Sequence, residues 1–102
     1  MPSYKLFYSN EALQEIRLIV QWYNEISPGL GDRFKKNLLA EIAKIKKAPQ
    51  TRSFRYNEVR LAVVRLFPYA AHYTIDENNL LIKIQAVLGF SQDSETNWKI
   101  RF

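Results

Sequence analysis

The residues of this 102-residue chain best suited to chemistry are its clustered arginines and its single histidine. Arg52, Arg55, Arg60 and Arg65 follow one another closely, and His72 comes soon after them. Cleavage of RNA by its own 2′-hydroxyl needs cations that stabilise the phosphate and a group that transfers protons near neutral pH. If the chain is a nuclease, Arg65 and His72 are its catalytic candidates. The alternatives are a structural arginine beside a turn and an ordinary half-exposed strand histidine.

Other kinds of site are excluded by composition. The chain has no cysteine and one histidine, which excludes disulfide scaffolds, thiolate metal sites, cysteine catalysis and a histidine-rich zinc site. The pair Asp76 and Glu77 falls in a turn without partners at ligand spacing. We therefore predict no metal and no cofactor. No apolar run approaches the roughly 20 residues of a membrane span, so we expect a soluble, cytoplasmic protein.

The net charge of +5 is unevenly distributed along the chain. Between Pro28 and Arg65 there are ten basic and only three acidic residues. A basic middle suggests an anionic partner, either nucleic acid or an acidic protein. The alternative is a lysine-rich surface that serves solubility, and direct contact with nucleic acid stays open.

The elements that must position these residues begin with a strand and two helices. Lys5–Tyr8 is a short aromatic and aliphatic run typical of a strand. Ser9 or Asn10 is a suitable cap for a first amphipathic helix, whose apolar stripe comprises Leu13, Ile16, Val20 and Tyr23. Ser27-Pro28 predicts the start of a second helix, whose apolar face comprises Phe34, Leu38, Ile42 and Ile45. The short connection predicts an antiparallel helical hairpin.

After Pro49 the pattern changes to that of β-strands. The predicted strands are Ser53–Tyr56, Val59–Phe67, Ala70–Ile75 and Leu80–Leu88, joined by short turns. We therefore expect one α+β domain over residues 1–102, in which the N-terminal strand and the helical hairpin pack on one face of a mostly antiparallel sheet.

The other face of the sheet is the expected docking surface. In the last strand, Leu80, Ile82, Ile84, Ala86 and Leu88 should point to the helices, whereas Lys83 and Gln85 should point away. His72 and Thr74 of the preceding strand should share that second face. The strand from Val59 adds either Arg60, Ala62 and Val64 or Val63 and Arg65, because a shift of one residue exchanges the two sets.

The order and spacing of these pieces resemble the RelE/ParE superfamily, the toxins of bacterial type II toxin–antitoxin modules. The match is closest to the ParE-like, plasmid-stabilisation branch and extends over roughly Tyr4 to Trp98. The segments that carry the resemblance are Glu11–Ile16, Ser27-Pro28, Arg33-Phe34, Pro49, Val64–Tyr69, His72–Asp76, Ile84–Leu88, Asp93 and Trp98.

The resemblance implies a small cytoplasmic toxin that a cognate antitoxin, encoded beside it, neutralises. ParE-like members poison DNA gyrase without chemistry of their own, whereas RelE-like members cleave messenger RNA on the ribosome. Here Leu88-Gly89-Phe90-Ser91-Gln92 follows the last strand, so the arginine expected of a ribosome-dependent nuclease is missing. The resemblance therefore favours inhibition of gyrase by binding. The alternatives are a RelE-like endoribonuclease, which would be an enzyme, and an inactive module that only binds its antitoxin.

Two sets of residues are the candidate binding sites. The predicted target-binding residues are Arg52, Arg55, Arg60, Arg65, His72 and Lys83. The predicted antitoxin-binding residues lie on the helical hairpin and at the C-terminus, where an antitoxin would add a helix or a strand to the toxin; they are Ile19, Ile26, Leu30, Leu39 and Phe102.

Overall fold

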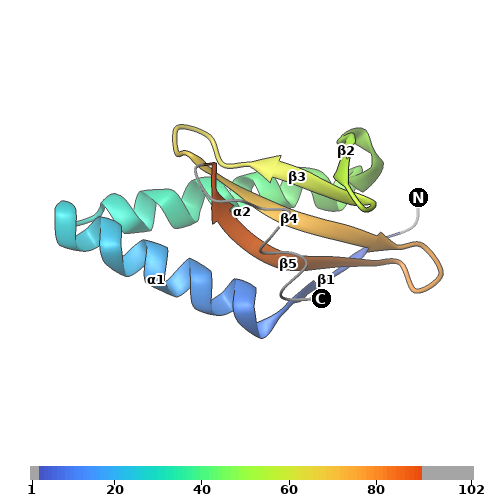
Figure 1. The fold of residues 1–102 in the computed structure, drawn as a ribbon, viewed down its shortest axis with the longest axis horizontal. Helices are drawn as coiled ribbons and strands as arrows, with labels where there is room; N and C mark the ends of the chain where they lie inside the picture. Colours follow the sequence, from blue (N-terminus) through green and yellow to red (C-terminus); the bar gives the residue numbers. More distant parts are fainter. Residues whose placement is uncertain (1–2, 91–102) are drawn as a thin grey trace.

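Two helices cover one face of a five-stranded sheet in the computed structural model, which describes residues 3–90 (Figure 1). The predicted α+β architecture is confirmed. Phe102, one of the predicted antitoxin contacts, lies outside the described residues. Within residues 3–90, no helix combines the length and the apolar character needed to cross a membrane.

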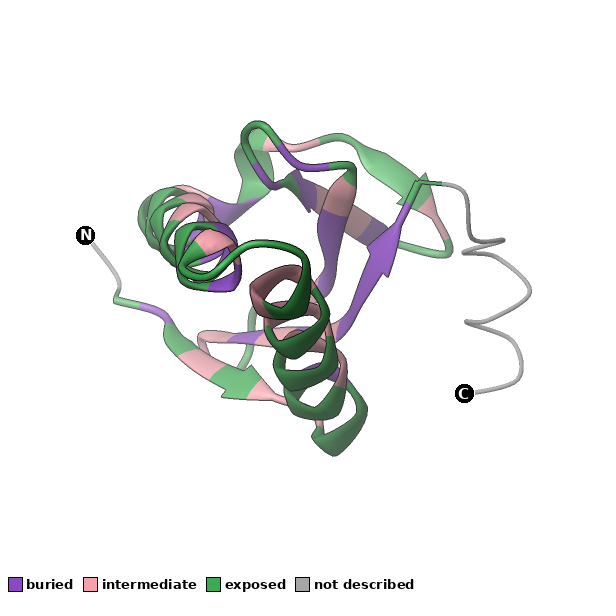
Figure 2. Ribbon diagram, turned by 90° about the vertical axis from the view of Figure 1, so that its left-hand side faces the viewer, coloured by how far each residue is buried: buried purple, intermediate pink, exposed green. Residues whose placement is uncertain are grey.

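Helices α1 (Asn10–Ile26) and α2 (Leu30–Lys47) form the predicted hairpin. The Ser9 side chain caps α1 by accepting a hydrogen bond from the backbone N–H of Ala12 at 3.0 Å. The predicted apolar face of α2 is confirmed, because Phe34, Leu38, Ile42 and Ile45 are all buried. Figure 2 shows buried residues gathered between the helices and the sheet.

The turn between the helices differs from the prediction. Ser27 is the C-cap of α1 rather than the N-cap of α2, and α2 begins only at Leu30. The chain reverses through Gly29, whose φ of 90° lies in the left-handed region that favours glycine. Ser27-Pro28 therefore marks the turn and not the first helical positions.

A second glycine allows the two helices to approach each other closely just after this turn. The backbone N–H of Gly31 donates to Oδ1 of Asn24 at 2.7 Å. A Cβ atom at Gly31 would lie 2.1 Å from the carbonyl oxygen of Val20, which is far inside van der Waals contact. From this close approach the helices splay apart toward the N-terminus of α1 (Figure 1).

The sheet has the strand order β1-β5-β4-β3-β2. Its strands are β1 (Lys5–Tyr8), β2 (Phe54–Tyr56), β3 (Val59–Val63), β4 (Tyr69–Asp76) and β5 (Leu81–Gly89). Strand β1 pairs with β5 in parallel, and the remaining neighbours are antiparallel. A short 3₁₀ helix, Pro49–Thr51, connects α2 to this second half of the chain.

A β-bulge in β5 changes which side chains reach the core. Tyr73 pairs with Ile84, but the adjacent His72 pairs with Ala86, so Gln85 is an extra residue. The predicted alternation therefore holds only as far as Ile84. Beyond the bulge Val87 joins the core, and Ala86 and Leu88 lie on the opposite face.

Side chains at the start of α1 satisfy the backbone at this bulge. The Ser9 hydroxyl donates to the carbonyl oxygen of Gln85 at 3.0 Å. The backbone N–H of Val87 donates to a carboxylate oxygen of Glu15 at 2.9 Å. Helix α1 therefore fixes the position at which the alternation changes.

Strand β3 ends at Val63, four residues before the predicted end. The β3–β4 turn, residues 64–68, closes with a hydrogen bond from the Val64 N–H to the Tyr69 carbonyl oxygen at 2.9 Å. Its Phe67 ring packs against Phe34 and Tyr23, with centroids 5.3 Å and 5.1 Å away. Burial of Phe67 in this aromatic cluster pulls the chain out of the extended strand.

Candidate functional site

Arg60 and Arg52 hold the connection between α2 and β2 in place. The Arg60 guanidinium donates to the carbonyl oxygens of Gln50 and Arg52 and lies 4.2 Å from the ring centroid of Phe54. Arg52 forms an ion pair with Glu41 at 3.2 Å. Both guanidinium groups therefore have structural partners within the chain.

Arg55 and Arg65 are exposed, but they lie at different ends of the sheet. Arg55 is in the short edge strand β2, beside the start of β3. Arg65 is in the β3–β4 turn, beyond the end of β3, where its carbonyl oxygen accepts a hydrogen bond from Nδ2 of Asn37 at 2.9 Å. The two exposed arginines do not converge on one point.

His72 is buried, although it lies on the face of the sheet opposite the helices. It is 1% exposed, and its Nδ1 lies 2.9 Å from the hydroxyl of Tyr56. A histidine at this depth is not presented to a substrate on the surface. Lys83, in β5, is half-buried and pairs with Thr74.

The outer face of the sheet, opposite the helices, follows from this register. It carries Leu61, Val63, Ala70, His72, Thr74, Lys83, Ala86 and Leu88. The register of β3, which the sequence leaves open, is now fixed. Arg60 pairs with Tyr73 and, like Ala62 and Val64, faces the helices. Lys83 is the one lysine or arginine in this outer-face set.

Residues 3–90 also hold no cluster of three or more histidine and carboxylate side chains that could bind a metal ion. Asp76 instead accepts hydrogen bonds from the backbone and side chain of Asn79, which lowers the pKa of its carboxyl. This carboxylate therefore caps the turn between β4 and β5.

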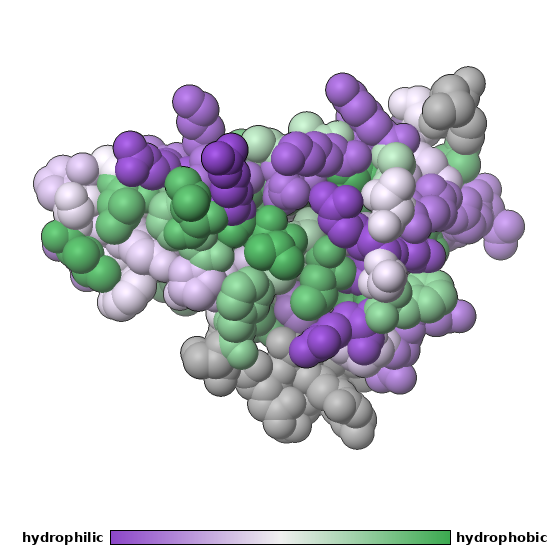
Figure 3. Space-filling view, turned by 90° about the horizontal axis from the view of Figure 1, so that it is seen from above, coloured by the Kyte–Doolittle hydropathy of each residue, from purple (hydrophilic) through white to green (hydrophobic). Residues whose placement is uncertain are grey.

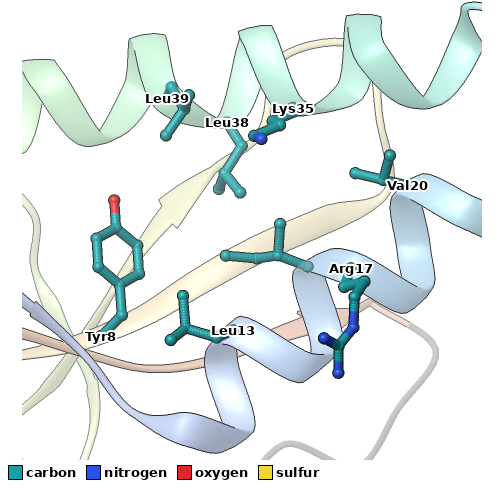
Figure 4. A pocket seen from close by; sticks show the side chains of 8 residues that line it. Tyr8, Leu13, Arg17, Val20, Lys35, Leu38 and Leu39 are labelled. Carbon is teal, nitrogen blue, oxygen red and sulfur yellow. The ribbon is translucent and has the colours of Figure 1, made fainter.

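An apolar groove lies between the two helices. This interhelical groove has a volume of about 480 Å³. It is lined by Tyr8, Leu13, Ile16, Arg17, Val20, Lys35, Leu38 and Leu39 (Figure 4). Leu13 from α1 and Leu39 from α2 are 51% and 46% exposed, so apolar surface is left uncovered there.

Cationic side chains border this groove on both sides. Arg17 extends from α1 and Lys35 from α2, and both are exposed (Figure 4). Tyr8 of β1 lies at one end, and burial raises the pKa of its hydroxyl. The groove therefore suits an amphipathic helix with apolar residues on one side and acidic residues beside them.

The predicted antitoxin-binding residues do not share one groove. Leu39 lines the interhelical groove, whereas Ile19 lines a different hollow beside Tyr69 and Leu88. Ile26 is exposed at the end of α1, and Leu30 packs half-buried on the core. The periodicity of α1 predicts Leu13 in the apolar stripe that faces the core, whereas the splay of the helices leaves Leu13 exposed.

The family and the solved structures that this chain is similar to all belong to toxin–antitoxin systems. Residues 6–93 match the family described as ParE toxin of type II toxin-antitoxin system, parDE. A chain of the chromosomal ParDE toxin–antitoxin system from P. aeruginosa superposes with a TM-score of 0.73 at 14% identity, covering 85% of this chain and 96% of that one. No match is found among curated protein sequences.

Two E. coli structures share the same fold. A chain of the intact RelBE toxin–antitoxin complex superposes with a TM-score of 0.68 at 16% identity, covering 88% of this chain and all of that one. The isolated RelE toxin superposes with a TM-score of 0.67 at 15% identity, covering 96% of each chain. At these identities the likeness concerns the fold.

Proposed function

Because the chain belongs to the ParE toxin family of type II toxin–antitoxin systems, we propose that it arrests growth by binding DNA gyrase and that a cognate antitoxin neutralises it. The resemblance to ParE-like members supports gyrase as the target. Such a toxin acts in the cytoplasm and needs neither a metal nor a cofactor.

One observation supports binding over RNA cleavage. The candidate proton-transfer group is buried, whereas the candidate cation is exposed in a turn beyond the end of β3. His72 is 1% exposed and lies next to Tyr56, whereas Arg65 is exposed in the β3–β4 turn. In-line cleavage needs both functions around the same phosphate. The absence of an arginine within Leu88–Gln92 favours the same choice.

The target contact should involve the exposed cations of the predicted set. Arg55 and Arg65 are free to meet carboxylates of a protein surface, and Lys83 is partly accessible. Arg52 and Arg60 are engaged with Glu41 and with backbone carbonyls, so they support this surface from within the chain. His72 is buried, and we assign it to the scaffold.

The antitoxin contact should centre on the interhelical groove. A helix that folds on binding would place two or three apolar side chains between Leu13 and Leu39. Acidic residues flanking those anchors would meet Arg17 and Lys35. Of the predicted antitoxin contacts, Leu39 belongs to this groove, and Ile19, Ile26 and Leu30 would contact further parts of a longer partner.

The test uses the purified chain, purified gyrase, ATP and supercoiled plasmid. A gyrase poison should convert the plasmid to linear DNA, seen after protein denaturation, only when gyrase and the chain are both present. The control is a parallel translation reaction in which the 5′ ends of messenger RNA are mapped. Codon-dependent cuts without linear plasmid would replace the proposal by the endoribonuclease alternative. Inactivity in both reactions, with no growth arrest on induction, would leave an antitoxin-binding module.

A further inference from the structure

At the tip of the β3–β4 turn, Leu66 combines an exposed apolar side chain with an unfavourable backbone conformation. Leu66 is 79% exposed, the highest value among the large hydrophobic residues of the described part of the chain. Its φ of 70° lies in the left-handed region, where a side chain meets the backbone unfavourably. Glycine or asparagine would fit this position with less strain and without apolar surface in water.

The turn around Leu66 is nevertheless held firmly. Asn37 of α2 donates to the Arg65 carbonyl oxygen at 2.9 Å, and Val64 and Phe67 on either side are buried in the core. The Phe90 N–H donates to the Pro68 carbonyl oxygen at 2.9 Å, which ties the turn to the end of β5. Leu66 is therefore presented by a rigid support and does not belong to a loose loop.

The surroundings of the tip combine apolar and basic side chains. Val63 and Phe90 are 47% and 58% exposed. Arg65 is exposed, and so are Arg33 and Lys36 on the stretch of α2 that the turn contacts through Asn37. Figure 3, which looks onto the side of the molecule that carries this turn, shows apolar side chains set among hydrophilic ones.

We propose that the β3–β4 turn is the element that binds the protein target. Leu66 enters an apolar pocket of the target, and Arg65 pairs with a carboxylate at the rim of that pocket. This assignment rests on the proposed function and names the part of the chain that carries it out. The basic surroundings match an acidic protein surface. A protein pocket is favoured over a nucleic acid because a phosphate backbone gives an exposed leucine no favourable contact.

The test replaces Leu66 by residues that tolerate the left-handed conformation. Leu66→Gly and Leu66→Asn relieve the strain and remove the apolar anchor, whereas Leu66→Met keeps an apolar side chain. Leu18→Ala is the matched control, since Leu18 is another exposed leucine, 52% exposed, that belongs to α1 and not to this turn. Each protein is measured for its Tm, for growth arrest at matched intracellular amounts, and for plasmid cleavage with gyrase.

Leu66→Gly and Leu66→Asn should unfold at or above the Tm of the parent and yet need about tenfold more protein, or still more, for the same arrest. Leu66→Met and Leu18→Ala should act like the parent. Arrest by Leu66→Gly at the parental protein level would overturn the proposal.

The failure of this proposal can be told apart from the failure of the gyrase proposal. If the parent arrests growth without cleaving plasmid through gyrase, gyrase is the wrong target, and the growth comparison still decides the role of Leu66. If Leu66→Gly loses affinity for a DNA duplex in the absence of gyrase, the turn binds nucleic acid and the protein pocket is wrong. A parent that leaves growth unaffected would overturn both proposals.

Discussion

Tyr73 of β4 joins the sheet to the segment that follows α2. Its side chain is fully buried, and its hydroxyl donates to the carbonyl oxygen of Pro49 at 2.8 Å. Burial raises the pKa of this hydroxyl above the ordinary 10.0, although the nearby Arg52 and Arg60 act in the opposite direction. The neutral phenol is therefore the form that the folded chain stabilises.

Tyr73→Phe should lower the free energy of unfolding by about 1 kcal/mol, because the Pro49 carbonyl loses its buried donor. With a folded pKa above the unfolded one, the contribution of Tyr73 is fully present below about pH 10 and is lost as pH rises through the folded pKa. Urea unfolding at neutral and alkaline pH should show a weaker alkaline loss for Tyr73→Phe than for the parent. If Tyr73→Phe and the parent showed the same pH dependence, the raised pKa of Tyr73 would not contribute to stability, contrary to this prediction.

His72 allows the distinction between a scaffold residue and a catalytic residue to be measured. His72→Gln should lower stability by about 1–3 kcal/mol, because a buried polar contact with Tyr56 is disturbed. Growth arrest per amount of folded protein should stay unchanged. If the folded variant loses arrest by orders of magnitude, His72 acts in the chemistry and the binding mechanism is wrong.

At the scale of the elements, the close approach of the two helices depends on Gly31. Gly31→Ala would place a Cβ atom 2.1 Å from the Val20 carbonyl oxygen, so the helices must separate. We expect a loss of about 3 kcal/mol in the free energy of unfolding. Gly29→Ala is the matched control, because its Cβ meets no atom within 4 Å and only the positive φ is unfavourable, at about 1 kcal/mol. Equal losses for the two variants would contradict the close helix contact.

The interhelical groove gives a second prediction at this scale. Leu39→Glu places a carboxylate among apolar side chains and should repel an acidic, apolar-faced antitoxin helix. The affinity for the product of the neighbouring reading frame, measured by calorimetry, should fall at least about tenfold. Ala43→Glu, on an exposed part of α2 outside the groove, is the control. Equal affinities for the two variants would place the antitoxin elsewhere.

Local sequence patterns predict a helix or strand well where residues within that element alone determine its ends and its buried face. The four buried residues of α2 and the cap at Ser9 are examples. The alternation in β5 failed at Gln85 because Ser9 and Glu15, distant in sequence, satisfy the backbone of a bulge. Periodicity within one strand holds no information about such a contact.

At the scale of the whole molecule, the family and the α+β fold were predicted, but the placement of charge was not. The sequence shows that the middle of the chain is basic. It does not show that Arg60 turns toward the helix side to bind backbone carbonyls, or that His72 is buried beside Tyr56. These positions follow from strand register and from contacts between distant segments, which composition and spacing leave undetermined.

The most direct test of the central proposal is the binding of the purified chain to immobilised gyrase and, in parallel, to immobilised ribosomes at the same salt concentration. We expect saturable binding to gyrase, and only a weak, non-saturating signal from ribosomes that disappears as salt is raised. Saturable binding to ribosomes with none to gyrase would contradict the account.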